Sequence, residues 1–299
     1  MKSWLCIGLI VMAASAQAQD RDSRAKDNVY QDLMPALGAL ERGDVKQAID
    51  SLRPLATDGN TEAQYVLAGI LETTAPPVRD LQAAYDWYLR AAEAGHAGAQ
   101  NNLGAMYYDG RGVLRNPIEA AKWYKLAADQ GFAVAQTNLA LLYGNGVGVP
   151  QDMVEMAKLL KKAAEAGEPR AQAQLARMYL DGEGVPQNTT EAVRWFRNAA
   201  AQDNEGAQFF LAVLLQRGIG TPRDLEGAAA WFRRAANHGN RLAMLELAKA
   251  YELGLGIPAD PAQAKSWREQ AQQKPEPTAD KKNDPGNSTQ RADPRRPKP

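Results

Sequence analysis

The strongest constraint on the fold of this chain is a tryptophan that recurs in a register of 36 residues. Trp87, Trp123, Trp195, Trp231 and Trp267 occupy this register, and Leu159 fills the one slot between them that lacks a tryptophan. The same step separates Ala99, Ala135, Ala171, Ala207 and Ala243, with no residue inserted between units. A constant period of this length predicts a stack of equal supersecondary units, each packed against its neighbours.

Each unit is predicted to contain two helices joined by a short turn. In the second full unit, a single buried helical stripe is formed by Ala120, Trp123, Tyr124, Ala127 and Ala128. Asp and Asn are preferred N-caps, and they stand before these stripes at Asp44, Asp80, Asn116, Asp152, Asn188, Asp224 and Asp260. The predicted fold is therefore all-α, an α/α solenoid of 36-residue helix–turn–helix repeats.

Glycines mark both turns of the unit. Gly95, Gly131, Gly167 and Gly239 are expected to end the first helix in the left-handed conformation, and Asp203 replaces glycine in one unit. A Gly-x-Gly pair such as Gly110 and Gly112 closes each unit. These pairs follow no predicted strand and precede no Gly-Lys-Ser/Thr sequence. They therefore indicate tight turns rather than a phosphate-binding loop.

The repeat motif is similar to that of a known family. In the fourth full unit it reads Glu191-Ala192-x-x-Trp195-x-x-x-Ala199-Ala200, then Ala207-Gln208-x-x-Leu211, after Asp181-Gly182-x-Gly184-Val185. This pattern resembles the Sel1-like repeat. Five full copies span roughly residues 80–257, with a degenerate copy at 44–75 and a half-unit at 260–272. The resemblance implies a right-handed α/α solenoid related to tetratricopeptide repeats, over residues 28–272.

The N-terminal end of the solenoid is expected to be irregular. Pro54 is expected to interrupt the first helix of the degenerate copy, because proline lacks a backbone N–H. Residues 28–42 are expected to add a capping helix with one polar side, and the half-unit at the other end is expected to supply a C-terminal capping helix.

Both ends of the chain are predicted to lie outside the solenoid. Residues 1–18 have the form of a signal peptide, with Lys2, a short apolar run and the small-x-small site Ala16-Gln17-Ala18. We expect a mature chain that begins at Gln19 and is located in the bacterial periplasm. Residues 273–299 are rich in proline and charge, have no apolar periodicity, and are expected to be disordered.

The composition argues against several classes of function. The formal net charge is zero, whereas nucleic-acid binders normally carry a basic excess. No later stretch approaches the run of about 20 apolar residues that spans a bilayer, so a membrane-embedded protein is not expected. Cys6, the only cysteine, lies in the signal peptide, so the mature chain has no thiol for a disulfide or a metal site. We expect no metal and no cofactor.

The sequence contains no recognisable catalytic constellation. His96 and His238, the only histidines, occupy turn positions several units apart and are expected to be exposed. Within the repeats, Ser51 and Ser266 belong to neither a Ser-x-x-Lys nor a Gly-x-Ser-x-Gly motif. We therefore expect a protein that is not an enzyme.

One surface feature is a candidate binding site. Opposite the buried stripe of the first helices, basic residues recur from unit to unit; this set, named here the basic ladder, is Lys122, Lys125, Lys158, Lys161, Lys162, Arg194, Arg197, Arg233 and Arg234. In the related folds the first helix lines the concave surface, so the resemblance places the ladder in a groove. Acidic residues three positions earlier, such as Glu119 before Lys122, leave open the alternative of a solvated face.

The resemblance predicts a protein-interaction module of the periplasm, whose groove binds the acidic surface or an extended acidic segment of another protein. Relatives suggest two roles, the regulation of a membrane sensor and immunity against a type VI-secreted phospholipase. A cell-envelope scaffold and a peptidoglycan-related hydrolase are further alternatives. The sequence does not indicate the oligomeric state.

Overall fold

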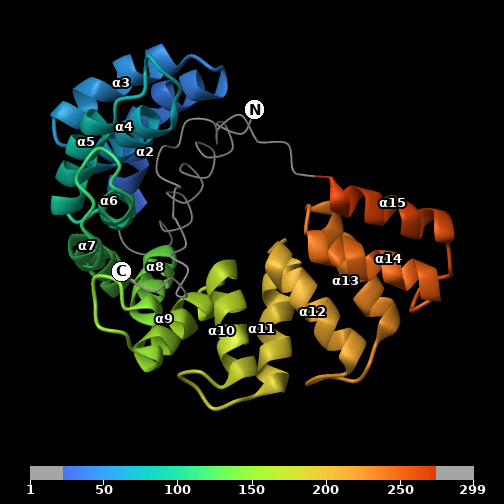
Figure 1. Ribbon diagram of the computed structural model, residues 1–299. Helices are drawn as coiled ribbons and strands as arrows, with labels where there is room; N and C mark the ends of the chain where they lie inside the picture. The colour runs from blue at the N-terminus through green and yellow to red at the C-terminus, as the bar shows by residue number, and fades with distance from the viewer. Residues whose placement is uncertain (1–22, 274–299) are drawn as a thin grey trace, which may run out of the picture. The chain divides into compact units, whose positions relative to one another are not determined.

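The computed structural model describes residues 23–273. Within this range the chain is all-α and contains no strand, which confirms the predicted fold class (Figure 1). The helices are α2 (Ser23–Glu41), α3 (Val45–Thr57), α4 (Thr61–Thr73), α5 (Leu81–Glu93), α6 (Ala97–Asp109), α7 (Pro117–Asp129), α8 (Ala133–Asn145), α9 (Met153–Glu165), α10 (Pro169–Asp181), α11 (Thr189–Ala201), α12 (Glu205–Arg217), α13 (Leu225–Asn237), α14 (Arg241–Leu253) and α15 (Pro261–Gln272).

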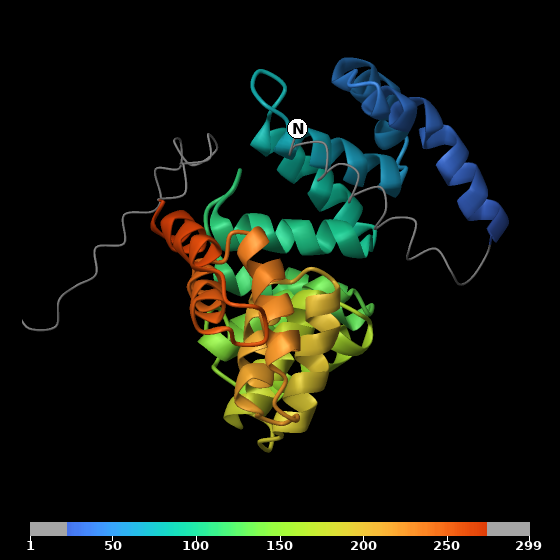
Figure 2. The ribbon, with the colours of Figure 1, turned by 90° about the vertical axis from the view of Figure 1, so that its right-hand side faces the viewer.

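The helices pack on their neighbours in sequence. Each helix from α2 to α10 contacts the next one along the chain, α13 contacts α14, and α14 contacts α15 (Figures 1 and 2). The described residues divide into two compact units. The first holds residues 23–207 and Ile219–Thr221, and the second holds Gln208–Gly218 and residues 222–273. The predicted signal peptide at 1–18 and the predicted tail, from residue 274 onward, lie outside the described residues.

The N-terminus of the first helix in each unit is capped as predicted. The cap side chains accept a hydrogen bond from the backbone N–H three residues later, for example Ala83 to Asp80 at 3.0 Å. The other predicted caps do the same: Asp44, Asn116, Asp152, Asn188, Asp224 and Asp260. Each such cap satisfies one of the backbone donors that a helix leaves free, and is worth about 1 kcal/mol.

The C-terminus of each first helix ends in the predicted left-handed residue. Gly95 has φ +91°, and the next backbone N–H, that of His96, reaches the Ala91 carbonyl oxygen at 3.0 Å. Asp203 takes the same role with φ 59°, and among the described residues it is the one non-glycine residue with positive φ. A short carboxylate side chain is among the few that tolerate this conformation. The predicted role of Asp203 is thus confirmed.

The glycine pairs have two separate tasks. The first glycine, for example Gly146 with φ 65°, caps the second helix in the left-handed conformation. The second glycine lies against the start of the first helix of its own unit: a Cβ added at Gly148 would stand 2.2 Å from the carbonyl oxygen of Pro117. Corresponding approaches of 2.0–2.4 Å occur at Gly112, Gly184, Gly220 and Gly256. The turn therefore has room for backbone only, which confirms the tight turn.

The core is formed mainly by the residue that follows the tryptophan register. Tyr88, Leu160, Phe196 and Phe232 are at most 1% exposed, and Tyr124 is 4% exposed. In the tryptophan register itself, Trp195 and Leu159 are buried, whereas Trp87, Trp123, Trp231 and Trp267 are only half-buried. The predicted burial of Trp123 is therefore wrong, and three other tryptophans of the register share its half-buried state. Indole rings are large enough to pack one face inward and leave one edge in water.

In four units a buried glutamine ties the two helices together. The Nε2 atom of Gln100 donates to the carbonyl oxygen of Ala92 at 3.0 Å, in the last turn of the preceding helix. Gln64, Gln136 and Gln172 repeat this bond at 2.9–3.2 Å. Because an unpaired amide in the core costs about 1–3 kcal/mol, the bond favours one alignment of the helix pair.

Two expectations about the N-terminal end need correction. Helix α3 runs through Pro54 to Thr57 without a break. Pro54 is exposed and lies in the last turn, so its ring meets no packed neighbour and only one helical hydrogen bond is lost. The helix expected at 28–42 is present, but α2 begins earlier, at Ser23, and runs to Glu41.

The second glycine of each pair should be more sensitive to substitution than a glycine that is merely left-handed. Gly131 has φ +84° with open space around its Cβ position, whereas Gly148, with φ +72°, meets the Pro117 backbone. Both alanine variants should lose about 1–2 kcal/mol for the left-handed conformation. Gly148→Ala should lose at least about 1 kcal/mol more because of the clash. Urea unfolding of the two variants measures this, and equal losses would contradict the assigned close approach.

Candidate functional site

The structure places every residue of the basic ladder on an exposed helix face. The residues of α7, α9 and α11, from Lys122 to Arg197, belong to the first compact unit. Arg233 and Arg234 on α13 belong to the second unit. The predicted exposure is thus present, and the ladder occupies the same positions of the first helix in each unit.

Most ladder residues contact a side chain of their own unit. Lys122 pairs with Glu119 at 2.6 Å, Lys158 with Glu155 at 3.2 Å, and Arg194 with Glu191 at 2.6 Å. In two further pairs the acidic residue lies four positions after the lysine: Lys125 pairs with Asp129 at 2.9 Å and Lys161 with Glu165 at 4.0 Å. Arg194 also stacks over Trp195 at 4.4 Å, and Arg234 stacks over Trp231 at 4.7 Å. Arg233 donates to the Tyr251 hydroxyl at 2.8 Å.

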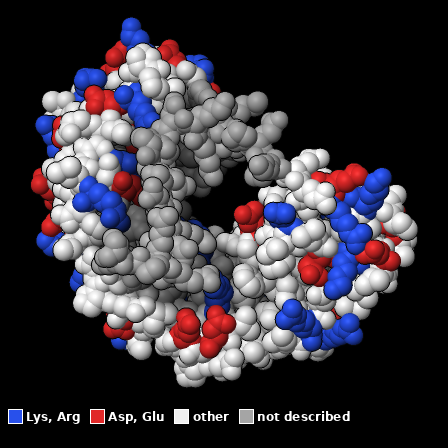
Figure 3. Space-filling view, viewed as in Figure 1, with Lys and Arg blue, Asp and Glu red and all other residues white. Residues whose placement is uncertain are grey.

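These pairs leave the ladder available to a partner. Exposed ion pairs are worth at most about 1 kcal/mol, so a partner carboxylate can compete for the same cations. The hydrogen bond and charge of Asp129 raise the pKa of Lys125, which stays charged at any physiological pH. The acidic partners also reduce the positive electrostatic field of the ladder. On the face shown in Figure 3, basic and acidic side chains are interspersed. The binding role of the ladder stays a prediction.

His96 differs from its expected place as an exposed turn residue. Its Nδ1 accepts the N–H of Ala99 at 3.0 Å and so caps helix α6. The ring stacks on Tyr65 at 4.5 Å, and Nε2 lies 3.1 Å from a carboxylate oxygen of Glu62. The His96 side chain is only 18% exposed. The sequence could have shown the cap, because Asn60, Asn204 and Asn240 hold the same register position. His238 is exposed, as expected, and contacts Gln208 at 3.2 Å.

A series of hydrogen-bonded polar side chains links helices α8, α6, α5 and α4 of the first compact unit. Asn138 on α8 donates to Asn101 at 2.9 Å, and Asn101 donates to Asn102 at 3.1 Å. Asn102 donates to the hydroxyl oxygen of Tyr88 at 3.0 Å, which in turn donates to Glu72 at 3.0 Å. Burial holds the pKa of the Tyr88 hydroxyl well above its usual value, so it remains a donor. The sequence analysis did not anticipate this network.

The network ends beside a groove on α8, named here the α8 groove, which consists of two adjoining cavities. The smaller, of about 260 Å³, is lined by Tyr108, Tyr124, Asn138, Leu141, Leu142, Asn145 and Arg170. The larger, of about 630 Å³, is lined by Leu141, Gly144, Asn145, Gln151, Met153, Met156, Gln174, Arg177, Glu183 and Gly184. Since both cavities share Leu141 and Asn145, they form one continuous depression within the first compact unit.

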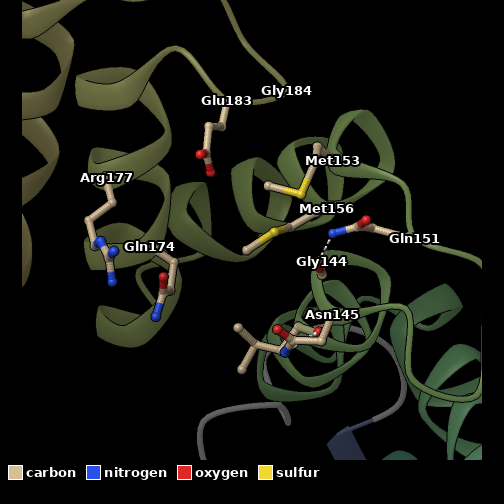
Figure 4. A pocket seen from close by; sticks show the side chains of 10 residues that line it. Gly144, Asn145, Gln151, Met153, Met156, Gln174, Arg177, Glu183 and Gly184 are labelled. Atoms are coloured by element: carbon tan, nitrogen blue, oxygen red, sulfur yellow. Dashed lines mark hydrogen bonds between the residues drawn. The ribbon is translucent and has the colours of Figure 1, made fainter. Parts of the chain in front are cut away.

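The lining of the larger cavity combines an apolar floor with a polar rim (Figure 4). Met153 and Met156 extend from α9 towards the space between α8 and α10. Gln174 and Arg177 stand on α10, and Asn145 stands at the end of α8. An apolar floor with a few polar groups at its edge is the usual composition of a binding pocket.

Two residues that line the larger cavity depart from the repeat, one on α8 and one on α9 of the following unit. Gly144 stands where the other units carry Tyr108, Leu180, Gln216 and Glu252, and Met156 stands where they carry Ala84, Ala120, Ala192, Ala228 and Ala264. A Cβ at Gly144 would lie 2.5 Å from the sulfur of Met156, so the small residue makes room for the large one. This paired exchange is the sequence signal that could have located the groove.

The described part of the chain shows no arrangement suited to a metal or a membrane span. Residues 23–273 contain no group of three or more His, Cys, Asp or Glu side chains placed to hold a metal ion. None of the helices in that range is both long and apolar enough to cross a bilayer.

The role of His96 as a cap can be tested by substitution. His96→Ala removes the cap of α6 and the partner of Glu62, whose side chain is only 14% exposed, so it should cost about 1–2 kcal/mol of unfolding free energy. His96→Asn keeps a capping side chain, as Asn60 and Asn240 do in other units, and should lose less than the alanine variant. Thermal and urea unfolding measure both, and an Asn variant as unstable as the Ala variant would refute the capping role.

Comparisons with known proteins bear on the fold and the family. A family model described as Sel1 repeat matches residues 61–96, 97–132, 133–168, 169–204, 206–240 and 241–271. Each match pairs a second helix with the following first helix, so the six matches cover the five full copies, half of the degenerate copy and the C-terminal half-unit. Among curated proteins no match is found.

Two solved structures share the fold at substantial sequence identity. A Sel1 repeat protein from Oxalobacter formigenes is 33% identical with TM-score 0.71, and the match covers 81% of this chain and 97% of that one. A protective antigen of uropathogenic Escherichia coli strains, displaying an SLR fold, is 34% identical with TM-score 0.71 over 75% of this chain. This chain spans only 48% of that antigen. An immunity protein from Pseudomonas aeruginosa is 22% identical over 71% of this chain and 80% of its own, with TM-score 0.49, and carries no functional argument.

Proposed function

Because this chain belongs to the Sel1 repeat family, we propose that it is a non-catalytic protein-interaction module of the bacterial periplasm. Its partner is another protein with an acidic surface or an extended acidic segment. A membrane sensor whose periplasmic part is bound by this module is the partner class that best fits an exported repeat protein without a catalytic constellation. The cations of the first helices supply the attraction, because they recur at the same positions in successive units and are all exposed.

The single observation that carries this proposal is that the positions used for folding are separate from the exposed positions within the repeat. Caps, turn glycines and buried columns are used for the fold in every unit, as at Asn116, Gly148 and Phe196. The exposed positions of the helices have no structural task of this kind. A stack of this type presents them side by side, so a long surface rather than a cluster of reactive groups is what the chain offers a ligand.

The periplasmic location predicts a processed N-terminus. The site Ala16-Gln17-Ala18 should be cleaved during export, so that the mature chain starts at Gln19. N-terminal sequencing of the protein recovered from the periplasmic fraction of a bacterial host tests this. A chain that retains Met1, or one found only in the cytoplasmic fraction, contradicts the proposed location.

Charge reversal in the basic ladder should abolish capture of the partner. We choose Lys125, Lys161, Arg197 and Arg233, which occupy one column of the repeat, and replace all four by Glu. The tagged mature protein and this variant are compared by pull-down from periplasmic extract and mass spectrometry. The wild-type complex should weaken steeply with added salt, because exposed charges are screened within about 10 Å at 0.1 M ionic strength.

A matched control distinguishes the effect of the position of these four cations from the effect of net charge alone. Four exposed cations outside the ladder, Lys46, Arg53, Lys249 and Lys265, are replaced by Glu, which changes the net charge by the same amount. Both variants should keep the helical circular dichroism of the wild type. The control should still capture the partner. If the ladder variant captures it equally well, the ladder is only a solvated face.

A further inference from the structure

We propose that the α8 groove is the anchoring site for an extended segment of the partner polypeptide, with an apolar side chain inserted against Met153 and Met156 and an acidic residue beside Arg170 and Arg177. The inference rests on the proposed function and adds to it the place and the chemistry of the contact. It concerns the first compact unit alone, since every lining residue belongs to that unit.

The floor of the groove fits an apolar side chain of variable shape. Leu141 and Met153 are half-buried, and Met156 is 8% exposed, so their apolar surfaces form the bottom of an open cavity rather than a sealed core. Methionine side chains are unbranched and polarizable, and they adapt to ligands of different outline. Burial of an apolar anchor in such a pocket is the kind of contact that dominates binding between proteins.

The rim of the groove fits the backbone of an extended chain. Asn138 and Gln174 occupy the same register position on α8 and α10, so their primary amides recur along the groove. Among the described residues, the Asn138 Oδ1 atom accepts no hydrogen bond and the Gln174 amide has no hydrogen-bond partner. A primary amide both donates and accepts, which matches the N–H and C=O groups that an extended segment presents.

The charges of the groove favour an anionic segment. The two cavities are lined by two guanidinium groups, Arg170 and Arg177, and one carboxylate, Glu183. All three side chains are exposed. The excess of one positive charge agrees in sign with the basic ladder, so the same acidic partner can meet both surfaces. The two adjoining cavities suit a ligand longer than one side chain, such as a segment of polypeptide.

The proposal is tested first with a displayed library of random linear peptides selected on the mature protein. The enriched peptides should share an apolar residue close to Asp or Glu, and a fluorescein-labelled synthetic consensus peptide should bind in an anisotropy titration. Selection that yields no enriched peptide, or peptides without an apolar and an acidic position, overturns the proposal. Because this arm uses no natural partner, its failure is distinct from a failed pull-down of the proposed periplasmic partner.

Two substitutions then test whether the peptide binds in the α8 groove. Leu141→Lys inserts a charge between the cavities, and other units already carry Arg177 and Lys249 at this position, so the fold tolerates it. Met153→Asp places a carboxylate on the floor at the first residue of α9, where the helix dipole favours it. Each should weaken peptide binding by about tenfold or more, the loss that corresponds to about 1.4 kcal/mol.

Matched controls carry the same new charges outside the groove. Ile118→Lys and Val154→Asp alter side chains that are 58% and 53% exposed and line neither cavity. Both controls should bind the peptide as the wild type does. If Leu141→Lys and Met153→Asp also bind as the wild type, the groove is not the site. If all four variants weaken binding equally, the effect is one of general charge and the proposal fails.

Methyl resonances report the contact directly. In the protein labelled at methionine methyl carbons, the Met153 and Met156 signals should shift on addition of the consensus peptide, whereas Met34, which is 61% exposed on α2, should not. Sedimentation of the wild type and of Leu141→Lys completes the test. A self-associated wild type that Leu141→Lys converts to monomer would assign the groove to a second copy of the chain and overturn the proposed occupant.

Discussion

The structure depends on closing the ends of short helices. Every helix from α3 to α14 has 13 residues, so free backbone donors and acceptors recur every few turns along the chain. Within one unit, these groups are satisfied by a capping side chain, Asn116, and by turns with left-handed residues, Gly131 and Gly146. The close approach of Gly148 to Pro117 leaves room for backbone only. These requirements fix the spacing of the turn residues, and with it the constant period of the repeat.

The same requirement explains where function can reside. Positions that cap, turn or fill the core are committed to the stack, so recognition must use exposed positions or departures from the repeat. The basic ladder belongs to the first kind and the α8 groove to the second. At the groove, Gly144 is smaller and Met156 is larger than the residues at the same positions of other units. Neither change alters the cap at Asp152 or the turn at Gly148. The repeat therefore tolerates a cavity between two successive units because its helix ends are closed independently of that cavity.

The periodic features of this fold could be predicted from sequence because each is set by local chemistry. The caps from Asp44 to Asp260 and the left-handed Asp203 follow from backbone geometry within a few residues, and they are confirmed. The features that were missed depend on three-dimensional neighbours. The half-burial of Trp87, the contact of His96 with Glu62, which lies 34 residues earlier, and the cavity beside Gly144 arise between helices, where register alone does not give distances. The continuity of α3 through Pro54 was missed because the cost of proline depends on its place in the last turn.

The central claim is that the partner binds where the repeat departs from its pattern. Amide hydrogen exchange of the mature protein, measured alone and in complex with a partner purified from periplasmic extract, tests this most directly. The account predicts slowed exchange in the segments that line the α8 groove, around Leu141–Asn145 and Gln174–Gly184, and unchanged exchange in α3 and α4. Slowed exchange confined to other segments, or spread evenly over all units, would contradict it.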